Sequence, residues 1–425
     1  MAGFDLEDFD GTLEEAGYAF LASSAYTDPD RWHAAAAKVR AEDPVHWVDH
    51  PDFNPFWVVS KHADVMEIEM HNEGFLNEPR GILGPKEADL QRVERGGQFI
   101  KSLVVMDGPE HKAHRDLAAS WFRPSNLRKL QGRLDELSAE ALQKMIDGGG
   151  ELDFATDVAM QYPLQVILAM MGLPQSDYPR MLKLTQELFG AGDPELARDS
   201  EDQMAGLNET ILDFFNYFNA ITADRKANPT DDFCSVVANA EIDGEPIALM
   251  EQLGLYIIAA TAGHDTTSHA MAGGLEALIS HPDQLARLQA DPDLITTAVD
   301  EMVRWTTPVK HFMRTATRDY ELGGKTIEEG QDVFLSYWSA NRDEDVFEDP
   351  FTFDVGRRNN NHVGFGFGVH FCLGAILAKM ELSSLFAELV PRISSMGLAG
   401  GDSLSQSYFV SGYKHLPIHY SVSPA

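Results

Sequence analysis

One of the two cysteines in this 425-residue chain stands in a setting that favours chemistry over packing. Cys372 closes the stretch Phe365-Gly-Phe-Gly-Val-His-Phe-Cys, and a helix-like segment follows at Ala375–Leu385. Glycines let the backbone approach a flat molecule closely, and amide N–H groups at the start of a helix stabilise a thiolate. So few cysteines exclude a disulfide framework and a zinc site of several thiolates. Two interpretations remain for Cys372: a buried small hydrophobe, as most free cysteines are, or the proximal ligand of a heme iron.

A second polar group interrupts the long apolar stretch Ala248–Gly273. It contains Asp265 followed by two threonines, of which Thr266 is expected to donate its hydroxyl proton to the carbonyl of Ala262 and so loosen the helix. An acid next to an alcohol in such a helix suits the transfer of protons into a buried site. The alternative is a kinked helix whose polar groups satisfy one another locally.

A third pair, Glu301 and Arg304, has the i, i+3 spacing that places a carboxylate and a guanidinium on one helix face. Alone this pair means little, because exposed ion pairs stabilise proteins by only about 0–1 kcal/mol. Its position between the acid–alcohol stretch and the cysteine loop makes it informative.

Taken in this order, the three motifs resemble those of cytochrome P450 monooxygenases. The FGxGxHxCxG loop around Cys372 is highly specific for that family, and the AGxDT stretch Ala262–Thr266 is moderately so. The resemblance extends over residues 32–417 and includes Phe353-Asp-Val-Gly-Arg357. It implies that Arg357 joins Glu301 and Arg304 in a buried polar triad.

The resemblance implies heme b (iron-protoporphyrin IX) as the cofactor, with Cys372 as the metal ligand. Two heme propionates in a pocket of low dielectric need cationic or N–H donors, and four residues match the family's anchors: His111, Arg115, Arg314 and His370. For each of these alone, a surface ion pair or a satisfied core histidine is the alternative. The full set of expected cofactor-binding residues is His111, Arg115, Ala262, Arg314, Phe365, Gly366, His370, Cys372 and Gly374.

The implied activity is that of an oxidoreductase acting on paired donors, in which dioxygen, two electrons and two protons convert a C–H bond to an alcohol. Asp265 and Thr266 are the expected catalytic residues. No GxGxxG segment follows an expected strand, so electrons are expected from an iron–sulfur ferredoxin with its reductase. The basic cluster from Lys112 to Arg133, with Lys379, is the expected docking face. A heme-thiolate peroxygenase, an isomerase and a heme sensor are the alternatives.

The expected substrate-binding residues are mostly apolar, which predicts a hydrophobic substrate. They are Ile258, Thr261, Val309, Phe312 and Val410. The stretches Thr261–Thr267 and Val309–Arg314 resemble the bacterial branch that hydroxylates terpineol, related monoterpenes or alkyl aromatics. A steroid or fatty-acid hydroxylase is the alternative, although a carboxylate would find an anchor only if Lys310 or His311 faced inward.

Composition limits the partners and the compartment. A net charge of −34 argues against nucleic-acid binding and against anionic membrane surfaces. No run of eighteen apolar residues occurs, and the acidic N-terminus lacks the features of a secretion signal. We therefore expect a cytoplasmic protein without a membrane span.

The elements that must position these residues are mainly helical, which predicts a mainly α fold. The resemblance implies the cytochrome P450 fold, a large helical domain with the heme buried between two long helices. Residues 1–425 are expected to form one domain, with an N-terminal extension at 1–30 and a small β region from 31–70 and 314–337. Hairpins are predicted around Gly323-Gly324 and within Ser407–Val422, and the segment from Gly74 to Ser102 resists assignment. Helical periodicity predicts helices at Leu127–Ile146, Ala155–Met171, Glu201–Ala227 and Ala248–Gly273, and one or two amphipathic segments within Asp283–Trp305.

Overall fold

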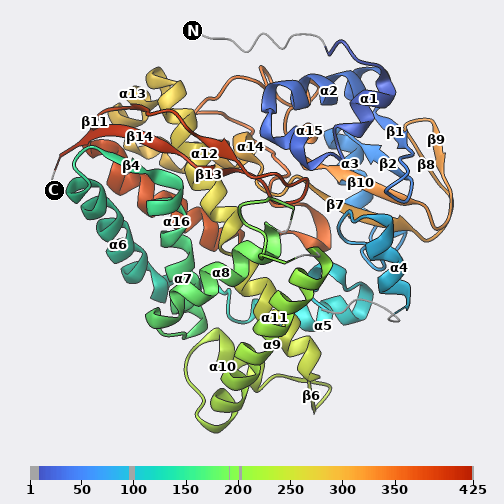
Figure 1. Cartoon of the computed structure of the whole chain (residues 1–425), viewed down its shortest axis with the longest axis horizontal. Helices are drawn as coiled ribbons and strands as arrows, with labels where there is room; N and C mark the ends of the chain where they lie inside the picture. Colours follow the sequence, from blue (N-terminus) through green and yellow to red (C-terminus); the bar gives the residue numbers. More distant parts are fainter. Residues whose placement is uncertain (1–8, 95–100, 191, 201–202, 424–425) are drawn as a thin grey trace.

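Two helices, α12 (Asp265–Ser280) and α16 (Ala375–Leu389), lie at the centre of the larger, helical part of the molecule. α16 packs against α6 (Pro124–Asp147) and α14 (Ile295–Thr306), and α12 also packs against α14 (Figure 1). The computed structural model describes residues 9–94, 101–190, 192–200 and 203–423. Its architecture confirms the mainly α fold with a small β region.

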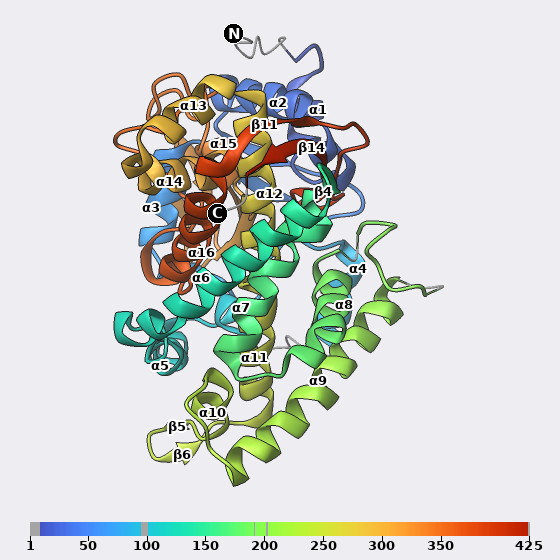
Figure 2. The same cartoon turned by 90° about the vertical axis from the view of Figure 1, so that its left-hand side faces the viewer.

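The remaining helices surround this centre, and α8 and α9 pack against each other (Figure 2). They are α1 (Leu13–Tyr18), α2 (Pro29–Glu42), α3 (His62–Met70), α4 (Lys86–Glu94), α5 (Gly108–Ala119), α7 (Gln161–Met171), α8 (Tyr178–Phe189), α9 (Gln203–Ala227), α10 (Phe233–Ala238), α11 (Leu249–Ala262), α13 (Pro282–Ala290) and α15 (Tyr337–Ala340). The helix predicted from Ala155 instead begins with a π-helical turn, Ala155–Ala159, before α7. The start predicted at Glu201 lies outside the described residues.

A five-stranded sheet forms most of the β region, in the order β1-β2-β10-β7-β3. Its strands are β1 (Val45–Val48), β2 (Phe56–Val59), β3 (Phe75–Leu76), β7 (His311–Ala316) and β10 (Asp332–Ser336). β10 pairs in parallel with β2 and in antiparallel with β7, so one strand joins the early and late parts of the chain. Apolar side chains cover both faces of β10, whose five residues are all buried.

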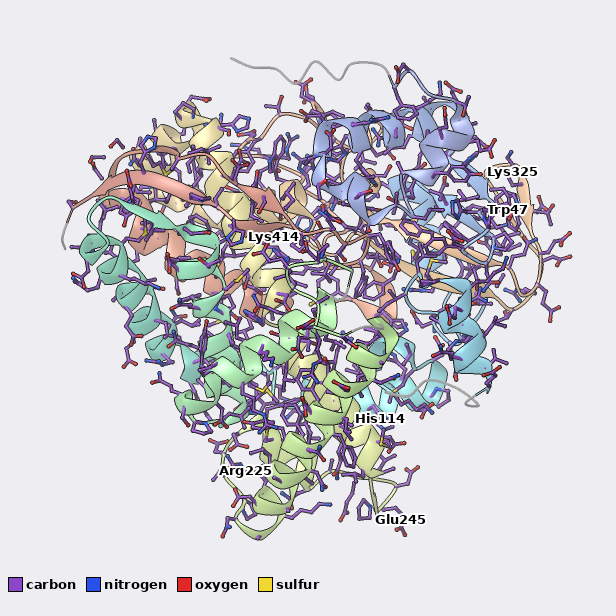
Figure 3. All side chains as sticks on the ribbon, in the orientation of Figure 1. Trp47, His114, Arg225, Glu245, Lys325 and Lys414 are labelled. Atoms are coloured by element: carbon purple, nitrogen blue, oxygen red, sulfur yellow. The ribbon has the colours of Figure 1, made fainter. Side chains whose placement is uncertain are left out.

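The smaller strands confirm one predicted hairpin and show that the other is wrong. β8 (Tyr320–Leu322) and β9 (Lys325–Ile327) pair across Gly323-Gly324, where both glycines have positive φ. Near the C-terminus, β13 (Tyr413–His415) pairs with β12 (Ser403–Leu404), whereas β14 (Pro417–Val422) pairs with β11 (Ile393–Leu398) and β4 (Glu151–Asp153). Only Leu416 separates β13 from β14, which is too short a link for the chain to reverse. A further pair, β5 (Glu241–Ile242) with β6 (Glu245–Pro246), lies at the tip of the helical part, where Figure 3 labels Glu245.

The long helix predicted at Ala248–Gly273 is broken into α11 and α12 at two residues, Gly263 and His264. A side chain at position 263 would clash, because a Cβ there would lie 2.4 Å from the Cδ1 of Ile167. As predicted, the Thr266 hydroxyl donates to the Ala262 carbonyl, at 2.6 Å. The break therefore lies where the polar residues of this stretch are.

The segment that resisted assignment contains β3 and α4. Among the described residues of α4, no side chain is buried, which explains its weak periodicity. Gly96 and Gly97 of this segment lie outside the described residues. Within the described ranges, we find no helix that is both long enough and apolar enough to cross a membrane.

Candidate active site

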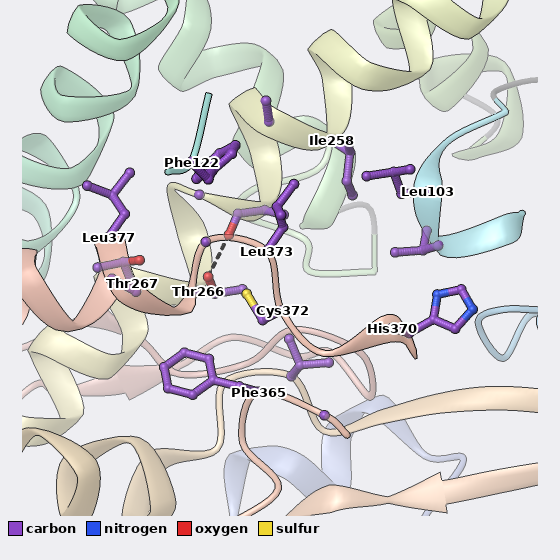
Figure 4. A pocket seen from close by; sticks show the side chains of 18 of the residues that line it. Leu103, Phe122, Ile258, Thr266, Thr267, Phe365, His370, Cys372, Leu373 and Leu377 are labelled. Atoms are coloured by element: carbon purple, nitrogen blue, oxygen red, sulfur yellow. Dashed lines mark hydrogen bonds between the residues drawn. The ribbon is translucent and has the colours of Figure 1, made fainter. Parts of the chain in front are cut away.

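A cavity lies between the α11–α12 break and the loop that leads into α16 (Figure 4). Cys372 lies on one side of it and Thr266 faces it from the opposite helix. Leu103 and Ile258 line another part, and His370 lies toward one edge.

The cysteine loop has a conformation that needs glycine. Gly366 and Gly368 adopt φ values of +67° and +66°, and a Cβ at Gly368 would lie 2.5 Å from the backbone oxygen of Glu69. The loop closes where the N–H of Cys372 donates to the Phe365 carbonyl, at 2.8 Å. The sulfur of Cys372 is thereby held at the cavity wall just before α16 begins.

The surroundings of Cys372 act on its charge in opposite directions. Cys372 is exposed to the cavity, yet the protein that surrounds it desolvates the thiol and raises its pKa, whereas the N–H of Gly374, the positive charge of Arg115 and the N–H of Ala375 act to lower it. Desolvation has the larger effect, so the free thiol is neutral at ordinary pH. A metal that binds this sulfur would displace the proton and take the thiolate.

One edge of the cavity carries a cluster of polar side chains. The rings of His111 and His370 are tilted by 33° with centroids 4.0 Å apart, and Arg115 and Arg314 also line this edge. The buried Nε2 of His111 has no hydrogen-bond partner within the part of the chain that the structure describes. Burial lowers the pKa of His111 to about 4 and also lowers that of His370. The cluster thus offers neutral donors and guanidinium charges to an anion in the cavity.

Three residues that sequence reasoning missed hold this cluster in place. The Arg314 guanidinium donates to the buried Glu69 carboxylate at 3.0 Å, so its charge is partly balanced from behind. Asn77 lines the cavity and its side chain contacts both His370 and Asp107. Burial alone would raise the pKa of Asp107, but the nearby His370 ring, 3.9 Å away, and hydrogen bonds from the N–H groups of Glu78 and Asn77 hold it at about 2.

These donors fit the heme cofactor. Two propionate carboxylates match an edge with two guanidinium groups, two histidines and an unpartnered ring nitrogen. The cavity offers one cysteine sulfur, and its walls away from the polar edge are apolar. This combination matches a macrocycle whose iron takes one ligand from the protein. All nine residues predicted to bind the cofactor line this one cavity.

The two predicted catalytic residues occupy different positions. Thr266 lines the cavity, and because its hydroxyl proton is committed to the Ala262 carbonyl, its oxygen is left to accept hydrogen bonds. Asp265 does not line the cavity and is only 7% exposed. Among the described residues its Oδ2 has no hydrogen-bond partner. Burial raises the pKa of Asp265, and His264 acts to lower it.

The five predicted substrate-binding residues divide into two groups. Ile258, Val309 and Phe312 line the cavity, whereas Thr261 and Val410 lie behind its wall. The Thr261 hydroxyl donates to the Ile257 carbonyl at 2.7 Å, and Val410 pairs with Val309 through an isolated β-bridge. Both side chains are buried in contacts with the protein itself. Further apolar residues of the wall are Leu103, Val104, Phe122, Ile167, Met170, Phe233, Leu255, Ala259, Ala270, Leu377 and Leu382.

Comparison with known proteins agrees with this geometry. A family model described as Cytochrome P450 matches residues 85–394. Cytochrome P450-terp of a Pseudomonas species is 41% identical over 418 residues, covering 96% of this chain and 98% of that protein. Linalool 8-monooxygenase of Pseudomonas putida is 33% identical over 390 residues, covering 91% of this chain and 95% of that protein.

Solved structures agree as well. The crystal structure of CYP108D1 from Novosphingobium aromaticivorans matches with a TM-score of 0.89 at 39% identity, covering 96% of this chain and 99% of that one. Identity at this level over nearly the whole length extends the match from the motifs to the complete fold. The chain therefore belongs to the cytochrome P450 family and is a heme-thiolate monooxygenase that resembles bacterial members of it.

Proposed function

We propose that this cytochrome P450 hydroxylates a small-to-medium hydrophobic molecule, a terpenoid or an alkyl aromatic. The observation that carries the substrate class is the apolar wall of the cavity away from the polar edge, which includes Leu103, Ile258, Val309 and Phe312. Such a wall binds through removal of apolar surface from water, at roughly 25 cal/mol per Å². The names of two relatives, Cytochrome P450-terp and linalool 8-monooxygenase, support a terpenoid.

The two side chains that would anchor a substrate carboxylate are occupied elsewhere. Lys310 donates to the Thr306 carbonyl at 2.9 Å and lies 3.8 Å from the centre of the Trp338 ring. His311 lies within hydrogen-bond distance of the Tyr408 carbonyl and of the Leu83 N–H. Neither lines the cavity, which disfavours a fatty acid as the substrate.

In the proposed mechanism Cys372 holds the heme iron, and His111, Arg115, Arg314 and His370 hold the propionates. When bound, the heme supplies the oxidising chemistry that puts one oxygen atom of dioxygen into a C–H bond. Asp265 supplies protons, and the Thr266 oxygen accepts a hydrogen bond from a protonated group in the cavity. The residues proposed to pack against the macrocycle are Ala262, Phe365, Gly366 and Gly374.

Titration with candidate substrates tests the substrate class. A terpene or alkyl aromatic that fills the cavity near Ile258, Val309 and Phe312 is expected to displace water and to shift the heme spectrum from low to high spin. Monoterpenes, alkyl aromatics, steroids and fatty acids are added in turn to the purified ferric protein, and the apparent Kd is measured. A strong shift with fatty acids or steroids alone would contradict the proposal.

Replacing the cavity-facing alcohol tests the proton role. In Thr266→Ala, we expect product per electron consumed to fall about tenfold, equivalent to ~1.4 kcal/mol, while peroxide accumulates. The matched control is Thr261→Ala, because Thr261 makes the same bond to the carbonyl four residues back but does not line the cavity. Unchanged product yield in Thr266→Ala would refute the proton role and favour a peroxygenase or isomerase.

We further propose that electrons come from an acidic iron–sulfur ferredoxin. Much of the basic cluster is already paired within the chain: Lys112 with Asp116, Lys129 with Asp231, Arg133 with Glu136 and Glu140, and Lys379 with Asp300. Arg123 and Arg128 are exposed and have no ion-pair partner in the described ranges.

Exposed apolar residues lie in the cysteine loop and at the start of α16. Val369, Phe371 and Ile376 are 43%, 43% and 54% exposed, and none of them lines the cavity. The helix that begins just after Arg123 packs on α16, and Arg115 of α5 donates to the Phe371 carbonyl. The two arginines and these three residues form what we call the cysteine-loop surface, which supplies both charge and an apolar centre for a partner.

Charge reversal on the cysteine-loop surface tests the partner. In Arg123→Glu/Arg128→Glu we expect the KM for an acidic ferredoxin to rise about tenfold at low salt, because both changes repel the partner. The difference is expected to shrink as salt screens the charges. The matched control is Arg31→Glu, an exposed arginine on α2. Equal KM values for the double variant and the control, at low and high salt, would refute this docking surface.

A further inference from the structure

His264 lies fully buried at the break between α11 and α12, next to the proposed proton donor. Its Nε2 is 2.9 Å from the carbonyl oxygen of Met160. A carbonyl oxygen can only accept, so Nε2 carries a hydrogen and donates it. Any further proton on this ring must therefore be on Nδ1.

Nδ1 of His264 faces two oxygen atoms. It lies 3.1 Å from the Thr185 hydroxyl and 3.4 Å from Oδ1 of Asp265. The Thr185 hydroxyl also has the Leu182 carbonyl within 3.0 Å, so its single hydrogen has a second acceptor. A bare Nδ1 facing a carboxylate would place two lone pairs against each other. One proton on either Nδ1 or the Asp265 carboxyl removes that conflict.

Burial limits the pair to one such proton. With no proton on Nδ1 or the carboxyl, the pair would bury a net negative charge, and with one on each it would bury a net positive charge. Burial raises the pKa of Asp265, and the adjacent His264 acts to lower it. His269, one turn further along α12, stays neutral because burial lowers its pKa to about 3. A single shared proton leaves the pair neutral, as imidazole with carboxylic acid or as imidazolium with carboxylate.

We propose that His264 and Asp265 share one proton and that His264 is a positioning residue that keeps this proton available for delivery. When Asp265 gives the proton to the cavity, the pair is left with a buried negative charge, and one proton from solvent restores it. This inference rests on the proposed role of Asp265 in supplying protons.

The carboxyl C=O absorption of Asp265 in the ferric holoenzyme tests the shared proton. The band is assigned by its loss in Asp265→Asn and followed with pH in wild type and in His264→Gln, which keeps hydrogen-bonding groups but cannot become a cation. Without the cation, Asp265 is expected to ionise about one pH unit higher or more, a tenfold change in its ionisation equilibrium. The matched control, His269→Gln, is expected to leave the midpoint unchanged. An unchanged midpoint in His264→Gln would overturn the proposal.

A second measurement covers the case in which His264→Gln fails to fold. Nitrogen-15 NMR of labelled histidine in the diamagnetic ferrous carbonyl form reports the hydrogen on Nδ1 of His264. In Asp265→Asn the ring loses its counter-charge, so Nδ1 is expected to lose its proton at a pH about one unit lower than in wild type. Identical signals in both proteins would overturn the pair. If Asp265→Asn keeps full product yield, the proposed role of Asp265 in supplying protons is refuted. The infrared and NMR measurements still test the shared proton in that case.

Discussion

Replacing Cys372 by serine is expected to abolish hydroxylation. A serine hydroxyl is not ionised at neutral pH, so it cannot donate electron density to the iron as a thiolate does. We expect product formation to fall by roughly three orders of magnitude or more, equivalent to ~4 kcal/mol of transition-state stabilisation. Heme content, the absorption spectrum of the reduced carbon monoxide complex and product formation are measured on the same preparation.

The second cysteine of the chain provides the matched control. Cys234 is buried in α10 and does not line the cavity. Burial raises the pKa of its thiol, so it is neutral and inert. Cys234→Ala is expected to keep the thiolate-type spectrum and most of the activity. A Cys372→Ser protein that retained the thiolate-type spectrum would contradict the assignment of Cys372 as the ligand.

Sequence reasoning grouped several residues of the polar edge of the cavity because they lie in motifs with fixed local geometry. His111 and Arg115 are one helical turn apart on α5, and His370 is two residues before Cys372 in the same loop. Spacing within one turn or one loop fixes which side chains face the same way. His111, Arg115, His370 and Cys372 line the cavity together for this reason.

The residues that hold this edge from behind carry no such local signal. Glu69 lies at the end of α3, and Asn77 and Asp107 lie in the segment around β3 and before α5. They meet Arg314 and His370, which are more than 200 residues further along the chain, only after the fold has formed. Their partners are set by long-range packing, which spacing along a sequence does not record.

Predictions that depended on the exact direction of a side chain were weaker. Thr261 and Ile258 are close on α11, yet only Ile258 lines the cavity. Neighbouring positions on a helix differ by about 100° in direction, so a small rotation decides which one faces a site. The sequence also did not show which cations of the basic cluster are neutralised, because the acidic partners of Lys129 and Lys379 come from distant segments.

The structure changes the interpretation of the Glu301–Arg304 pair most. Both side chains are fully buried, and Arg304 donates to Glu301 through Nε and Nη2, each at 2.7 Å. Arg357 donates to the same carboxylate at 3.1 Å. Arg304 also donates to the carbonyls of Asn341 and Pro350, in the segment that precedes the cysteine loop. The predicted triad is therefore a buried network that fixes this segment on α14.

Replacing Glu301 by glutamine is expected to destabilise the protein more than any surface change. The substitution keeps the shape but removes the negative charge, which leaves the buried Arg304 and the nearby Arg357 without their counter-ion. Breaking a buried ion pair on one side costs roughly 3–5 kcal/mol. We expect the free energy of unfolding, measured by urea denaturation of the heme-loaded protein with circular dichroism, to fall by about that amount, together with heme retention.

Glu42→Gln is the matched control for this experiment, because Glu42 pairs with Lys38 on the surface of α2 at 3.0 Å with half of its side chain exposed. An exposed helical pair stabilises by only about 0.3–0.5 kcal/mol, so this variant is expected to unfold almost like the wild type. The comparison separates burial from charge, since both variants lose one carboxylate from an ion pair within a helix. Equal losses of stability in the two variants would show that the Glu301 network contributes no more than a surface pair. In that case the segment that precedes the cysteine loop would have to be held by its apolar contacts, such as those of the buried Phe353 and Val355.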